Sequence, residues 1–142
     1  MANIVPDSFK TDLLEGTFNF DTSGDTFRLA LYTDISGFST STTAYTTTNE
    51  VSSSGTNYTA GGNTLTNNGV SVSSNTAFVD FADLTFSSVT LTADSALIYK
   101  DTSNEAVLVL DFGGDKTATN GDFVIQFPAA DATNAIIRLG DA

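Results

Sequence analysis

Short apolar runs separated by clusters of Ser, Thr, Asn, Asp and Gly recur along most of this chain. From Thr17 onward the runs alternate apolar with polar residues, and this period of two is typical of half-buried β-strands. Strands are predicted near residues 69–74, 77–81, 84–91, 96–101, 106–112, 122–127 and 135–139. Their even spacing favours a sandwich or barrel over alternating strand–helix units. We therefore predict an all-β fold, a single antiparallel β-sandwich that is jelly-roll-like and takes in residues 1–142 as one domain.

The first strands are predicted to form a hairpin. Phe18 and Phe20 precede the turn residues 21–25, and the alternating segment 27–31 follows. Two glycine pairs, Gly61-Gly62 and Gly113-Gly114, are interpreted as turns or close backbone approaches, because no helix that could hold a phosphate follows them.

Two later segments carry more specific signals. The apolar parity changes within 84–91, which predicts a bulge or bend near Ser87 and Ser88, as occurs where a strand crosses between sheets. Segment 106–112 is apolar on both faces. This favours a central strand covered on both sides by its own chain, with cover by another chain as the alternative.

Residues 1–16 and 36–54 depart from the strand pattern. Residues 1–16 are predicted to be an N-terminal arm or short helix, because Phe9 and Leu13 lie at i,i+4 and Gly16 supplies a stop. Such a short helix is marginal alone, so it should persist only by packing on the domain or on a neighbouring subunit. Residues 36–54 are rich in Ser and Thr and are predicted to be a long surface loop or a weak edge strand.

Charge excludes several classes of partner. Seventeen acidic residues against five scattered basic residues give a net charge of −12, so no basic stripe can follow a row of phosphates. We predict no nucleic-acid partner and no membrane partner. No apolar run approaches 18 residues, and the start of the chain lacks a basic and then apolar leader pattern, so a soluble chain without a conventional export signal is expected.

Composition also argues against catalysis. The chain has no His, Cys or Trp, so the usual general base, thiol nucleophile and soft metal ligands are missing, and we predict that it is not an enzyme and holds no cofactor or metal. Paired carboxylates could offer oxygen ligands to calcium or act on a glycosidic bond. We favour turn capping for them, because each pair follows or precedes a strand. The pairs are Asp21 and Asp25, Asp80 and Asp83, and Asp111 and Asp115.

Several segments together resemble small virion proteins of tailed bacteriophages. The opening resemblance lies in residues 9–16 (FKTDLLEG), 20–21 (FD) and 25–33 (DTFRLALYT). It continues through residues 49–51, 58–65 (YTAGGNTL), 96–101 (ALIYKD), 111–116 (DFGGDK) and 120–123 (NGDF). Many members of this group are known only as phage structural proteins, and those with an assigned role look like capsid cement, or head decoration, proteins with a jelly-roll-like β-sandwich. The resemblance implies a protein that is made in the host cytoplasm, sits on the outer surface of the virion head and clamps neighbouring major capsid subunits.

The partners that this resemblance implies are the major capsid protein and further copies of the chain, as a homodimer or homotrimer, which would also cover exposed sheet edges. The residues predicted to make these contacts are Ile4, Val5, Phe9, Leu13, Tyr58, Thr59, Ala60, Gly61 and Gly62. One alternative is a host-recognition module on a head fibre or tail, which would read a glycan or protein receptor with the loop 36–54. Another is an enzyme acting on envelope polysaccharide.

Overall fold

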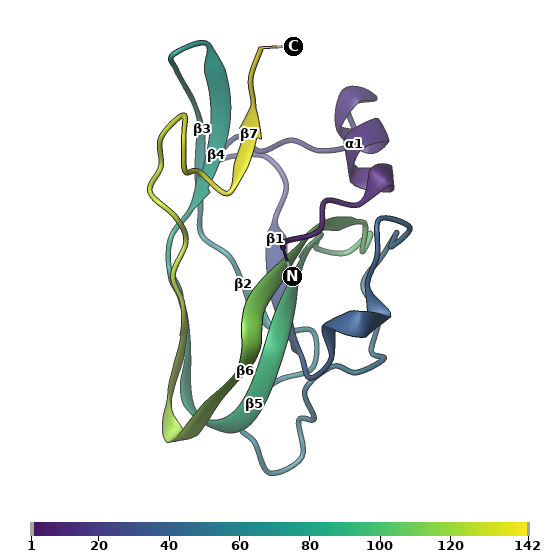
Figure 1. Cartoon of the computed structure of the whole chain (residues 1–142), viewed down its shortest axis with the longest axis vertical. Coiled ribbons are helices and arrows are strands. Elements are labelled where there is room, and N and C mark those ends of the chain that lie inside the picture. Colours follow the sequence, from purple (N-terminus) through teal and green to yellow (C-terminus); the bar gives the residue numbers. More distant parts are fainter. Residues whose placement is uncertain (1, 142) are drawn as a thin grey trace.

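The computed structural model describes residues 2–141 and is built from two antiparallel sheets and one short helix (Figure 1). One sheet has the strand order β2-β1-β5-β6 and the other β3-β4-β7. This confirms the predicted all-β, antiparallel sandwich with a short N-terminal helix. The elements are α1 (Asp7–Leu14), β1 (Phe27–Tyr32), the 3₁₀ turn η1 (Ile35–Gly37), β2 (Asn63–Thr64), β3 (Asn67–Ser73), β4 (Thr76–Phe81), β5 (Leu84–Lys100), β6 (Ala106–Ile125) and β7 (Ile137–Leu139).

Strands β5 and β6 form one long ribbon that replaces four of the predicted strands. Their register runs from Leu84 opposite Ile125 to Tyr99 opposite Ala106, with four irregularities on the way. One irregularity lies between Phe86 and Val89, where Ser88 has a φ of 55°, so the predicted bulge is confirmed. The ribbon bends sharply near its middle, at the lower end of Figure 1.

The predicted hairpin of Phe18 and Phe20 with segment 27–31 is wrong. Strand β1 pairs with β2 on one edge and with β5 on the other, so no edge is left for a further strand. The two phenylalanines instead pack their rings into the main core. Phe20 stacks on Phe27 with ring centroids 4.6 Å apart, and Phe18 lies 5.1 Å from Phe9 of the helix.

Segment 106–112 is covered on both faces by its own chain, as predicted. One face belongs to the main core and the other to a smaller apolar cluster that includes Tyr32, Leu97 and Val109. The predicted central position is wrong, because β6 is the outermost strand of its sheet. Its outer edge is partly covered by Ile4, whose backbone exchanges two 2.9 Å hydrogen bonds with that of Val109.

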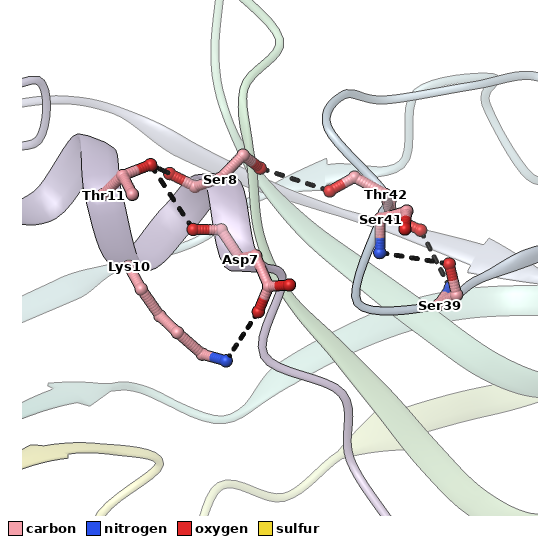
Figure 2. A network of polar contacts seen from close by, with 7 residues as sticks. All are labelled: Asp7, Ser8, Lys10, Thr11, Ser39, Ser41 and Thr42. Atoms are coloured by element: carbon pink, nitrogen blue, oxygen red, sulfur yellow. Dashed lines mark hydrogen bonds and ion pairs between the residues drawn. The ribbon is translucent and has the colours of Figure 1, made fainter.

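The helix α1 is fixed at both ends. At its start, the Asp7 amide donates to the Thr40 carbonyl at 2.9 Å, and the Ser8 hydroxyl donates to the Thr42 carbonyl at 3.2 Å (Figure 2). At its end, Gly16 has a φ of 82°, and the Thr17 amide donates back to the Asp12 carbonyl at 2.9 Å, which is a Schellman stop. The Ser/Thr-rich loop is thereby held against the helix.

Residues 36–54, all of which the structure describes, contribute only isolated bridges to the sheets, at Ala44 and Glu50. Within residues 2–141 the longest α-helix has eight residues, and none is long and apolar enough to cross a lipid bilayer.

Candidate functional site

An apolar groove of about 440 Å³ lies between α1 and β7. Its volume is within the range of ordinary binding pockets. The groove is lined by the arm, the helix, β6 and β7, through Val5, Phe9, Lys10, Leu13, Leu14, Val107, Leu108, Ile136, Ile137, Arg138 and Leu139.

The wall formed by α1 has a buried part and an exposed part. Phe9 is only 4% exposed because its ring packs against Phe18 and Phe20, and Leu13 is partly buried against the same core. Leu14 follows Leu13 but lies off this stripe and is 81% exposed. Val5, just before the helix, is 39% exposed. The helix therefore uses one stripe for folding and leaves large apolar side chains at the groove.

The opposite wall is the three-residue strand β7. One edge of β7 pairs with β4, with Leu139 opposite Ala77 and Ile137 opposite Val79. Its other edge pairs with no strand of residues 2–141. Because paired residues point to the same face, Ile137 and Leu139 share the face of the buried Val79, yet Leu139 is 62% exposed. The core face of this sheet thus continues into the groove.

The charges in the groove differ in sign from the rest of the protein. The charged residues among those that line it are Lys10 and Arg138, two of the five basic residues in a chain of net charge −12. Lys10 pairs with Asp7 at 2.9 Å on the exposed side of the helix (Figure 2). Arg138 donates one guanidinium hydrogen bond to the Thr133 carbonyl. The groove is therefore apolar, with Arg138 and the Asp7-paired Lys10 as its charged lining residues.

The predicted contact turn at residues 58–62 lies elsewhere and is held from within the protein. The Glu50 carboxylate accepts three hydrogen bonds, from the Tyr45 hydroxyl at 2.6 Å, the Tyr58 hydroxyl at 2.8 Å and the Gly61 amide at 2.6 Å. The Gly61 carbonyl in turn accepts from the Tyr99 hydroxyl at 2.7 Å. This Glu50 network fixes the turn against β1 and β5.

Little of this turn is available to a partner. Tyr58, Gly61 and Gly62 are buried, whereas Thr59 and Ala60 are exposed. None of the five residues lines the groove beside β7.

Burial also sets the protonation of the tyrosines. Loss of water around the hydroxyl raises the pKa of Tyr58 and of Tyr45, and the Glu50 carboxylate raises both pKa values further. Both hydroxyls are therefore proton donors at neutral pH, as the Glu50 network requires.

Glu50→Gln is expected to cost about 2 kcal/mol of unfolding free energy. An amide has one acceptor oxygen and two N–H donors, so it cannot accept from all three donors, and at least one of them faces an N–H. The measurement is the midpoint of urea unfolding followed by circular dichroism. Glu15→Gln is the matched control, since Glu15 is exposed at the end of α1 and the change in charge is the same. Equal midpoints for the two variants would mean that the network contributes nothing.

The structure brings together three of the predicted contact residues, Val5, Phe9 and Leu13, in the groove, while Ile4 pairs with β6. The list of predicted contact residues did not include Leu14, Leu139 or Arg138, which also line the groove. Leu14 had a signal, because it is an apolar residue off the helical stripe. Arg138 and Leu139 had no such signal in the sequence, since their place at a sheet edge depends on the pairing of distant strands.

Turn capping holds for only part of the acidic pairs, because Asp111 and Asp115 lie inside β6 and Asp83 bonds to a distant segment. Asp21 accepts hydrogen bonds from the hydroxyl and amide of Ser23, which lower the pKa of Asp21. Asp83 accepts from the Phe127 amide at 2.9 Å, and Asp111 from the Gly113 amide at 2.8 Å. Across residues 2–141, no three acidic side chains gather as a metal site would require.

A second, more open hollow of about 510 Å³ lies along the bent strand β6. Half-buried Phe112 and Phe127 contribute aromatic surface, and Asp122, Gln126 and Lys116 contribute polar groups. It is separate from the α1–β7 groove except for Ile136, which lines both.

Comparison with known proteins assigns no family to this chain. No protein-family model matches the sequence, and searches of curated proteins and of solved structures found no significant match.

Proposed function

We propose that this chain is a non-enzymatic structural protein of a bacteriophage virion, a capsid cement or decoration protein that binds the outer surface of the head and stabilises contacts between major capsid subunits. The observation that carries the proposal is the groove between α1 and β7, where Leu14 and Leu139 are largely exposed. Exposed apolar surface with a polar rim is typical of protein–protein contact sites. The sequence resemblance described above supplies the class of partner.

The physical demands of cement function fit this surface. A cement protein must add buried apolar area across a joint between subunits, and it needs no chemistry to do so. A free concentration one hundred times the dissociation constant would stabilise each occupied site by about 2.7 kcal/mol. A net charge of −12 would also keep the protein from adhering to the packaged genome. Val70 and Val72, exposed on β3, offer a separate apolar strip for contact between copies.

A double variant, Leu14→Gln with Leu139→Thr, is expected to weaken binding to heads by at least about tenfold, because two leucine side chains lose their apolar contact with the capsid. Binding is measured by co-sedimentation with expanded heads of the phage at two salt concentrations. Wild-type protein should saturate at an integer ratio to capsid subunits. Unchanged binding of the double variant would remove the groove from the contact.

Val124→Thr is the matched control for this experiment. Val124 is also a half-exposed apolar residue, but it lines the second hollow on β6. Its substitution should leave head binding unchanged, and circular dichroism should show that all variants are folded. A loss in Val124→Thr equal to that of the double variant would move the contact to β6.

The second candidate function is host recognition by a head fibre or tail, and the hollow on β6 is the observation that favours it. Aromatic surface beside Asp122 and Gln126 suits a small polar ligand such as a sugar. Failure to bind heads, together with retention of the isolated protein on host cells, would favour this candidate over the cement role.

A further inference from the structure

We propose that the groove binds an extended segment of a protein partner in which apolar and acidic residues alternate. This segment adds as a fourth strand to the sheet β3-β4-β7, at the free edge of β7. The capsid as the source of this segment rests on the function proposed above, whereas the mode of binding is a property of the groove itself. Strand addition to a sheet edge is a recurring mode of peptide recognition.

The first argument is the arrangement of the two walls. Strand β7 pairs with β4 on one side only, and the groove lies on its other side with α1 opposite. An extended segment laid in the groove can therefore pair its backbone with β7 while its side chains contact the exposed Val5 and Leu14. Three residues of β7 span about 10 Å, so three or four residues of the partner would pair.

The second argument is the pattern of side chains along β7. Ile137 and Leu139 point to one face and Arg138 to the other, since side chains alternate along a strand. A partner strand would gain most from apolar residues opposite Ile137 and Leu139 and a carboxylate opposite Arg138. Lys10, on the other wall, is paired with Asp7, so Arg138 is the cation that favours an acidic segment.

The same charges argue against a second copy as the occupant. Antiparallel pairing of β7 with the β7 of another copy, centred on the strand, would set Arg138 directly opposite its equivalent, which is destabilising. The two chains would also carry −12 each. A heterologous strand with a carboxylate opposite Arg138 avoids the first of these costs.

The test uses defined peptides and the full chain, so that it does not depend on heads. The probe is a ten-residue peptide of alternating valine and glutamate with blocked ends, and the comparison is the same peptide with lysine in place of glutamate. We expect the glutamate peptide to shift the amide resonances of Leu14 and of residues 137–139 and to slow hydrogen exchange in β7. The lysine peptide should bind at least about threefold more weakly.

Two protein variants separate local from overall charge. Arg138→Glu should abolish the preference for the glutamate peptide, whereas Lys116→Glu makes the same change in net charge, −12 to −14, outside the groove and should preserve it. An equal effect of both variants would overturn the local role of Arg138.

N-methylation of the peptide separates strand addition from side-chain docking. Two forms of the glutamate peptide, N-methylated at odd or at even residues, each block one edge of the peptide. Only one edge can pair with β7, so one form should lose binding and the other should keep it. Equal binding of both forms, absence of shifts in the groove, or concentration-dependent shifts in β7 without peptide would each overturn the inference. Head binding by wild-type protein decides the proposed function independently.

Discussion

Replacing Gly62 with alanine is expected to lower the free energy of unfolding by about 4 kcal/mol or more. A Cβ at this position would lie 1.8 Å from the carbonyl oxygen of Leu29 and 2.7 Å from the Cα of Ala30. Both atoms belong to the backbone of β1, where these two residues are fully buried, so neither can move aside without disturbing the core. Overpacking of this kind costs about 1–3 kcal/mol or more, and the φ of 75° at Gly62 adds about 1–2 kcal/mol of strain.

The expected decrease in melting temperature for Gly62→Ala is about 12–20 °C, measured by circular dichroism. Gly55→Ala is the matched control, because Gly55 has almost the same φ, 74°, but no atom within 4 Å of an added Cβ. The control should lose only the unfolding free energy that comes from backbone strain at positive φ, about 1–2 kcal/mol. Equal losses in the two variants would show that β1 yields to the added methyl group and that the close approach carries no cost.

The close approach at Gly62 also bears on how far the fold could be predicted from sequence. The strand period and turn residues were sufficient for the all-β class, and the parity change was sufficient for the bulge at Ser88. The merging of strands was not predictable, because Gly113 and the Asn120-Gly121 pair are local turn signals. In the structure, Gly113 and Asn120 adopt φ values of 77° and 46° inside β6. Pairing with β5 outweighs the local preference for a turn.

One wall of the candidate groove could be predicted from the sequence and the other could not. The helical wall followed from local rules, because the i,i+4 stripe and Gly16 define α1 and leave Leu14 outside the stripe. The β7 wall did not, because three residues carry too little periodicity to show which edge of a sheet they occupy. Residues 58–62 have a turn signal in the sequence, but their buried hydrogen bonds to Glu50 come from tertiary pairing.

Raising the pH above about 10 is expected to destabilise the protein steeply. Burial raises the pKa of Tyr32 and of Tyr58, and both residues are almost wholly inaccessible to water. In the unfolded chain each tyrosine ionises near pH 10. Above that pH the folded chain therefore holds more protons than the unfolded chain, so the contribution is complete below pH 10 and falls as the pH rises. The loss is about 1.4 kcal/mol per pH unit for each tyrosine.

For the two tyrosines together the loss reaches about 5 kcal/mol at pH 12, which is comparable with the whole stability of an ordinary domain. The measurement is urea unfolding at successive pH values from 9 to 12, with tyrosinate absorbance recorded alongside. Tyr32→Phe should lose about 1 kcal/mol at neutral pH, because the hydrogen bond to the Thr46 carbonyl is gone. Its stability should nevertheless fall with a smaller slope than that of the wild type above pH 10, since one fewer buried hydroxyl then drives unfolding. Titration of all four tyrosines near pH 10 in the folded protein, without any loss of stability, would contradict the burial on which this expectation rests.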